Sequence, residues 1–123
     1  MSHIVTVRAQ VKDPAAVEAA CRRLGLAQPT HGKATLYSGQ IEGLIVSFPG
    51  WTYPVVIDTT TGEVKYDNYE GRWGDPAELS RLLQMYAVEK AKLEARRKGH
   101  SVTEQPLADG SIKLVIQVAG GAA

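Results

Sequence analysis

Residues 75–99 of this chain contain, in unbroken order, the sequence signals for the start and the end of a capped helix. Asp75 suits an N-cap, Pro76 suits the first helical position, and Glu78 completes a capping-box pattern. At the other end, Lys98 and Gly99 supply the cation and the glycine that helix C-termini favour. The spacing therefore predicts a long helix over residues 76–98.

A hairpin pattern follows this helix directly. Residues 102–106 and 111–118 have the composition of strands, and between them stands Asp109-Gly110, a pair typical of a tight hairpin turn. A long helix joined to a hairpin restricts the architecture to helices combined with antiparallel sheet. The same stretch contains no evident catalytic motif.

The first part of the chain repeats these elements on a smaller scale. Asp13-Pro14 opens a short helix whose C′ residue is Gly25. We expect a loop over residues 27–33 and a turn over residues 39–43, where glycine and proline interrupt the pattern. Alternating or β-branched runs predict strands over residues 3–10, 34–38, 44–48, 53–58 and 63–66.

These elements predict an α+β fold in the order β-α-β-β-β-β-α-β-β. We expect a single two-layer domain over residues 1–118, with a mainly antiparallel sheet and two helices packed on one face. A chain of 123 residues fits one domain of this kind. The small residues 119–123 predict a flexible C-terminal tail.

Charge and cysteine content exclude several classes of protein. The net charge of +1 provides no general attraction for nucleic acid or an anionic membrane. The single Cys21 leaves no internal disulfide, which suits a reducing compartment. No apolar run has the length of a membrane span or the form of a signal peptide. We therefore expect a soluble cytoplasmic protein with no membrane partner.

Several short stretches together carry a family resemblance. They are Met1-Ser2-His3, Asp13 with Leu24-Gly25-Leu26, residues 99–105 and residues 109–115. On these residues the chain resembles the family of hypothetical chloroplast open reading frame proteins, which also occurs in bacteria as a domain of unknown function. The resemblance implies a small soluble protein, assigns no catalytic residue or cofactor, and suggests an AAA-type ATPase as a partner.

The residue types used in catalysis are scattered along the chain. His3, His31 and His100 lack the spacing of a zinc site, and Cys21 lies on the apolar side of the first helix. No nucleophile elbow or phosphate-binding glycine loop is present. Asp58 and Glu63 flank a turn, where acids are usually solvated. We expect no catalytic residue, no cofactor and no metal ligand.

Aromatic residues provide the first candidate site. Five of them, Trp51, Tyr53, Tyr66, Tyr69 and Trp73, crowd into one short stretch. The alternative is that they fill the core, which we favour for Tyr53 and Tyr66, with Trp51 and Trp73 left open. Tyrosine, tryptophan and arginine dominate binding hot spots. The candidate binding patch is Trp51, Tyr53, Tyr69, Arg72 and Trp73.

Basic residues at a helix end provide the second candidate. Arg96, Arg97 and Lys98 could bind a polyanion, or could simply be solvated and complement the helix dipole. Lys90 and Lys92 precede them, but Glu89 and Glu94 dilute the charge. We do not favour nucleic acid as a partner.

The sequence therefore predicts a non-enzymatic binding or adaptor module that acts through protein–protein contacts or self-association. Hairpin sheets have edges that a partner strand or a second copy can cover. Two alternatives stay open. One is a small-ligand or enzyme-accessory domain, with an aromatic pocket near Asp58 and Asp67. The other is nucleic-acid binding through the basic helix ends.

Overall fold

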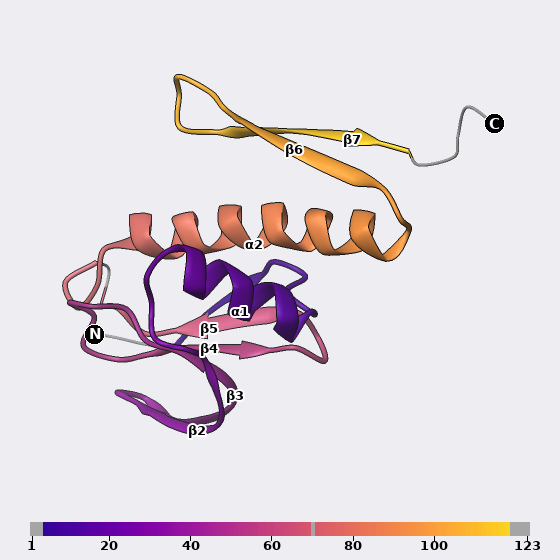
Figure 1. Ribbon diagram of the computed structural model, residues 1–123. Helices are drawn as coiled ribbons and strands as arrows, with labels where there is room; N and C mark the ends of the chain where they lie inside the picture. The colour runs from indigo at the N-terminus through magenta and orange to yellow at the C-terminus, as the bar shows by residue number, and fades with distance from the viewer. Residues whose placement is uncertain (1–3, 70, 119–123) are drawn as a thin grey trace.

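The computed structural model describes residues 4–69 and 71–118, which form an α+β fold (Figure 1). Both helices pack on one face of a five-stranded antiparallel sheet with the strand order β1-β5-β4-β3-β2. The elements are β1 (Val5–Arg8), α1 (Pro14–Arg23), β2 (Thr30–Leu36), β3 (Gly39–Val46), β4 (Val55–Asp58), β5 (Glu63–Tyr66), α2 (Pro76–Arg97), β6 (Ser101–Pro106) and β7 (Ile112–Gln117).

The side of the sheet that faces the helices carries the apolar core. The register pairs Val7 with Val64, and Val64 with Ile57, so these side chains share one face. Thr6 and Arg8 alternate with them and are exposed on the other face. The buried helix residues that complete this core are Ala16, Val17, Ala20, Cys21, Leu79, Leu82 and Tyr86.

The start of α1 is tied to the middle of α2. Oδ1 of Asp13 accepts hydrogen bonds from the backbone N–H groups of Ala15 at 3.0 Å and Ala16 at 3.4 Å, as an N-cap should. The hydroxyl of Tyr86 accepts two more, from the N–H groups of Lys12 at 3.1 Å and Asp13 at 3.2 Å. Tyr86 thus places its ring in the core and uses its polar end to hold the preceding loop.

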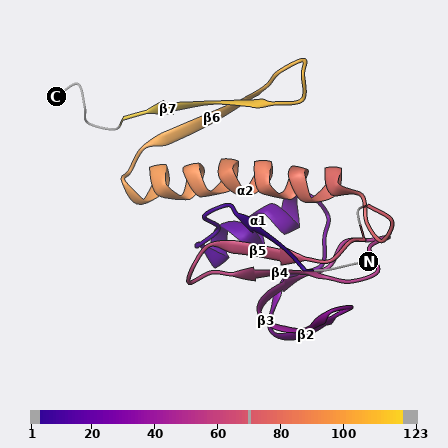
Figure 2. The same cartoon turned by 180° about the vertical axis from the view of Figure 1, so that it is seen from behind.

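Helix α2 buries two opposite sides of its surface. Tyr86 belongs to the main core, whereas Val88 and Ala95 are buried outside that core. Since successive helical residues are about 100° apart, Val88 lies about 200° around the axis from Tyr86. Figure 1 and the reverse view in Figure 2 both show α1 and the main sheet on one side of α2 and the β6–β7 hairpin on the other.

The β6–β7 hairpin is a separate two-stranded sheet and pairs with neither edge of the main sheet. Its register places Val102 opposite Ile116 and Glu104 opposite Leu114, so these four side chains share one face. Glu104 contacts charged groups of α1 and α2, which turns this face toward the helices. Gly99 ends α2 with a φ of 77°, as the Lys98-Gly99 pattern predicted, and starts the reversal into β6.

In the β2–β3 hairpin, two predictions of local structure were wrong. Residues 30–33 were predicted as loop but begin β2, and residues 39–43 were predicted as a turn but begin β3. Gly43 lies within β3, and this strand position requires glycine because a Cβ there would lie 2.6 Å from the carbonyl oxygen of Ile57. Glycine at this position permits a close approach of two strands and does not mark a turn.

This contact gives a testable prediction at Gly43. A Cβ there would also lie 2.9 Å from Cγ1 of Val56, whereas a Cβ at its strand partner Gly32 would find its nearest atom, on Ile45, at 3.8 Å. We expect Gly43→Ala to lower the free energy of unfolding by about 1–3 kcal/mol through overpacking, and the control Gly32→Ala to change it little. Urea denaturation measures both, and equal effects would contradict the assignment.

Candidate functional site

Buried polar groups without hydrogen-bond partners lie at the end of the fold where β3 and β5 finish and α2 begins. Within the described residues, three buried side-chain atoms lack a hydrogen-bond partner: Nε1 of Trp51, Oδ1 of Asp67 and Oε2 of Glu78. Trp51 follows β3, Asp67 follows β5, and Glu78 is in the first turn of α2. Because native proteins satisfy most buried polar groups, this end of the fold is where a binding site would be expected.

Backbone and side-chain hydrogen bonds order the connector between β5 and α2 over its described residues, 67–69 and 71–75. The backbone carbonyl of Asn68 accepts hydrogen bonds from the N–H groups of Gly71 at 3.1 Å and Trp73 at 2.8 Å. The Asn68 side chain donates to the carbonyl of Gly74 at 3.3 Å. Tyr69 has a φ of 49°, which is unusual for a residue with a side chain. The connector thereby fixes the directions of its aromatic side chains.

Trp73 is the centre of one aromatic group. Its ring centroid lies 4.9 Å from that of Tyr69, 5.2 Å from that of Tyr37 and 5.4 Å from that of Tyr53. The guanidinium carbon of Arg72 lies 5.1 Å from the centroid of the Tyr69 ring, within the range of a cation–π contact. Four of the five predicted patch residues therefore meet here, together with Tyr37, which the sequence analysis did not single out.

Trp51, the fifth predicted residue, lies in a different group. Its ring packs at 5.2 Å from Phe48 and 5.9 Å from Tyr66, against the main core. Gly74 contacts the indole face so closely that a Cβ would lie 2.2 Å from a ring carbon. The two tryptophans are near in sequence, but Trp51 supports the core and Trp73 gathers the tyrosines outside it.

The two acids expected near the aromatic residues behave differently. Asp67 is only 1% exposed, and its Oδ2 accepts a hydrogen bond from the Ser38 hydroxyl at 3.1 Å. Asp58 lies at the far end of β4 from Tyr53, and backbone N–H groups of Thr60 and Thr61 lower its pKa. Asp58 therefore stabilises the turn after β4, which is the ordinary role of an acid that flanks a turn.

A small pocket of about 170 Å³ opens between the end of α1, the end of the β3 segment and the first turns of α2. Its apolar lining comes from the residues that follow α1 and from the segment after β3, and its charged lining comes from Glu78 and Arg81. The lining residues are Leu24, Leu26, Phe48, Pro49, Glu78 and Arg81. No local pattern in the sequence indicates this pocket, because its residues come from three distant segments.

Glu78 does not complete the capping box that the sequence suggested. Oδ1 of Asp75 accepts a hydrogen bond from the N–H of Ala77 at 2.9 Å, so Asp75 is the N-cap. No hydrogen bond from the Asp75 N–H to the Glu78 carboxylate is formed, and Oε2 of Glu78 is left buried and unpaired. The Glu78 side chain lines the pocket instead.

The basic end of α2 is partly neutralised. Arg97 pairs with Asp13 at 3.5 Å, and Lys90 pairs with Asp13 at 3.3 Å and Glu94 at 3.1 Å. Arg96 and Lys98, the other two candidate polyanion residues, are exposed and make no ion pair within the described part of the chain. Successive residues also point about 100° apart, so the three basic side chains do not share one helix face.

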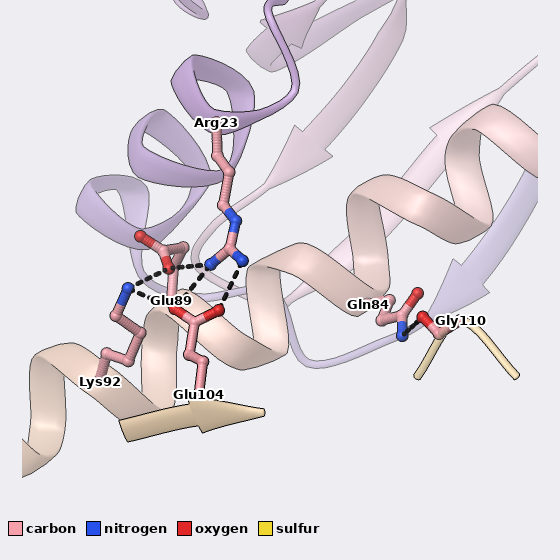
Figure 3. A network of polar contacts seen from close by, with 6 residues as sticks. All are labelled: Arg23, Gln84, Glu89, Lys92, Glu104 and Gly110. Atoms are coloured by element: carbon pink, nitrogen blue, oxygen red, sulfur yellow. Dashed lines mark hydrogen bonds and ion pairs between the residues drawn. The ribbon is translucent and has the colours of Figure 1, made fainter. Parts of the chain in front are cut away.

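A half-buried network of charges joins α1, α2 and β6 (Figure 3). Glu104 of β6 accepts hydrogen bonds from Arg23 at 2.8 Å and Lys92 at 2.7 Å, and both cations also contact Glu89, at 3.3 Å and 3.2 Å. Hydrogen bonds from Arg23, then Lys92, lower the pKa of Glu104 to about 2. Near the hairpin turn, the Gln84 side chain donates to the carbonyl of Gly110 at 3.3 Å.

The remaining titratable candidates contribute no site. Cys21 is fully buried, and desolvation raises its pKa to about 11, which suits a core residue and not a nucleophile. His31 is an exposed residue of β2, His100 follows α2, and His3 lies outside the described residues. Across residues 4–69 and 71–118, no three histidine, cysteine or acidic side chains gather closely enough to hold a metal ion.

Comparisons with family models, curated proteins and solved structures give no match to this chain. The resemblance to the chloroplast open reading frame family therefore stays a prediction. Neither α1 nor α2 has the length and hydropathy needed to cross a membrane.

The charge network predicts a pH-dependent contribution to stability. The pKa of Glu104 falls from 4.5 to about 2 on folding, so its stabilisation is complete above the unfolded value and is lost as the pH falls through the folded value. We expect Glu104→Gln to lower the free energy of unfolding by about 1 kcal/mol at neutral pH. The difference from wild type should disappear between pH 4.5 and about 2.

Urea denaturation at a series of pH values measures this difference. Glu63→Gln is the control, since Glu63 pairs, among the residues that the structure describes, only with the exposed Arg8, at 3.7 Å, and should change stability less. A Glu104→Gln difference that keeps its full size at the lowest pH would contradict the proposed role of the network.

The two tryptophans should differ in their importance for stability. Trp51→Ala removes a ring that packs against Phe48, Tyr66 and Gly74, and we expect a loss of about 3 kcal/mol or more in the free energy of unfolding. Trp73→Ala removes ring contacts with Tyr37, Tyr53 and Tyr69, which lie outside the main core, and should cost about 1 kcal/mol. Equal losses in thermal or urea unfolding would contradict this division.

Proposed function

We propose that this protein is a non-enzymatic binding module that acts through protein–protein contacts, with the free edge of β7 as its contact surface and a second copy of the chain as its partner. The observation that carries the proposal is the exposure of apolar side chains on β7 and just beyond it. Val115 is 43% exposed, Ile116 45% and Val118 61%. Exposed apolar residues concentrated on one edge strand are typical of an interaction surface.

The other sheet edges are better protected than β7. β1 has only four residues, and β2 carries the exposed polar residues His31 and Lys33. β6 contains Pro106, which cannot donate to a further strand, and the ion-paired Glu104. The only charge on β7 is Lys113. By the rules that natural proteins follow to block edges, β7 is the edge left open for pairing.

The sequence of β7 is complementary to itself in an antiparallel pair centred on Val115. This register places Ile112 opposite Val118, Leu114 opposite Ile116 and Lys113 opposite Gln117, so it sets no like charges against each other. Two copies would form a four-stranded sheet around a twofold axis, in which apolar side chains of the two β7 strands lie side by side on both faces. An interface of one strand pair is small, so we expect dimerisation that depends on concentration.

The resemblance suggests an AAA-type ATPase as a further protein partner, which stays a prediction. Nucleic-acid binding through Arg96, Arg97 and Lys98 is less well supported, because Arg97 is already paired with Asp13. The cluster of Tyr37, Tyr53, Tyr69 and Trp73 stays an alternative contact surface, since these aromatic side chains and Arg72 are the residue types of hot spots.

A charge exchange at Val115 tests the proposed dimer. We expect wild-type protein to dimerise in analytical ultracentrifugation, and Val115→Lys or Val115→Glu each to weaken dimerisation about tenfold, because like charges would meet on the twofold axis in place of apolar side chains. An equal mixture of the two variants should associate again, since lysine would then face glutamate.

Thr103→Lys is the matched control, because Thr103 is the β6 partner of Val115 and lies one strand away from the axis. It should dimerise as the wild type does. A wild-type chain that stays monomeric at every concentration, or a mixture of the two Val115 variants that does not associate, would overturn the proposal.

A further inference from the structure

The pocket between α1 and the start of α2 combines apolar walls with one unpaired group of each charge. Leu24, Leu26, Phe48 and Pro49 supply the apolar surface, and Glu78 and Arg81 supply the charges. We propose that this pocket binds a free α-amino acid with an aliphatic side chain of about the size of leucine. This binding site is separate from the β7 edge and does not depend on self-association.

The size of the pocket limits the class of ligand. A volume of about 170 Å³ is close to that of engineered cavities of about 150 Å³ that accept a benzene ring. It is well below the 300–1,000 Å³ or so that larger cofactors and drug-sized ligands occupy. A nucleotide or a large cofactor therefore does not fit, whereas one amino acid of moderate size does.

Glu78 shows why the ligand should carry an ammonium group. Its Oε2 is shielded from water and has no hydrogen-bond partner within the described residues. A desolvated carboxylate oxygen without a partner is costly. The local sequence offers Glu78 an alternative in the capping box with Asp75, and the side chain lines the pocket instead. A rotation of the carboxylate about its last side-chain bond would turn this oxygen toward the pocket, where an ammonium group would supply the missing hydrogen bond.

Arg81 shows why the ligand should also carry a carboxylate. It is an exposed residue at the pocket that makes no ion pair with any residue in 4–69 or 71–118, Glu78 included, although the two are three positions apart on α2. Guanidinium groups recognise carboxylates by paired hydrogen bonds. An amine alone would leave Arg81 unused, whereas an amino acid presents both charges on one carbon, within reach of two side chains on adjacent helical turns.

The remaining part of such a ligand would lie against the apolar wall. Leu24 and Leu26 leave α1 and Phe48 follows β3, so the aliphatic side chain would rest on residues that already pack against the main core. The order of preference should therefore follow apolar size up to the limit of the pocket. Glycine has both charges but no side chain, and tryptophan exceeds the volume.

The test measures binding of L-leucine to the full chain. Phe48 lies 5.2 Å from Trp51, so ligand binding should change Trp51 fluorescence. Trp73→Phe leaves Trp51 as the only tryptophan, because the chain contains two. Isothermal titration calorimetry provides a second readout. We expect saturable binding of L-leucine, with binding at least about tenfold weaker for glycine, leucinamide and isocaproate, which lack the side chain, the carboxylate and the ammonium group respectively.

Two variants assign the charges to their residues. Glu78→Gln should lower the affinity for leucine about tenfold and leave the affinity for isocaproate unchanged. Arg81→Gln should lower the affinity for leucine by a similar factor and leave that for leucinamide unchanged. Glu18→Gln on α1 and Arg96→Gln on α2 are controls for the loss of one charge, since both side chains are exposed and lie outside the pocket. Circular dichroism verifies that each variant is folded.

Three results would overturn the proposal. The first is no saturable binding of leucine to the folded wild-type chain. The second is equal leucine affinity in wild type, Glu78→Gln and Arg81→Gln. The third is binding of the doubly blocked N-acetyl-leucinamide as tightly as leucine, which would show that the pocket takes an apolar side chain of a protein partner instead. Val115→Lys should bind leucine as the wild type does, so a failure of the proposed dimer and a failure of this site are distinguishable.

Discussion

The architecture depends on a helix that is buried from two opposite sides. One side of α2 supplies Leu79, Leu82 and Tyr86 to the core beneath it, and the opposite side buries Val88 and Ala95 under the hairpin. A surface helix of an α+β domain usually has one apolar stripe and a solvated back. Here the back of α2 is exposed at Ala77 and Gln84 but buried at Val88 and Ala95. The position of the β6–β7 hairpin follows from this second apolar side.

Charged groups hold the layers in register where apolar contact is sparse. Glu104 reaches from β6 to Arg23 and Lys92, and Asp13 receives Lys90 and Arg97. These cations are the same residues that give the helix ends their basic appearance in the sequence. Their partners come from distant segments. Of the candidate polyanion residues, Arg97 is therefore held in a structural ion pair, whereas Arg96 and Lys98 are exposed and make no ion pair within the described residues.

The two proposed sites differ in how far the sequence could reveal them. The β7 strand and its apolar composition follow from alternation and the Asp109-Gly110 turn, but its exposure follows only from the hairpin standing apart from the main sheet. The pocket was hidden because Leu24, Phe48 and Glu78 come from separate segments. Glu78 is the one pocket residue that a local pattern singled out, because the capping-box rule predicted that its side chain would bond to the backbone of Asp75. Positions where a local rule fails are often functional or strained, and Glu78, which lines the pocket, is such a position.

Hydrophobic periodicity and terminal residues determined the identity and order of the elements. Asp13 and Asp75 cap their helices, and Glu63 to Tyr66 forms its strand as predicted, because these signals act between residues close in the chain. Only the tertiary structure decided that Gly43 lies within a strand. It also decided that Trp51 and Trp73 belong to different aromatic groups. Finally, it brought Arg81 and Glu78 to one pocket, where they do not pair. Each of these outcomes depends on which distant atoms approach, and a one-dimensional pattern carries no distances.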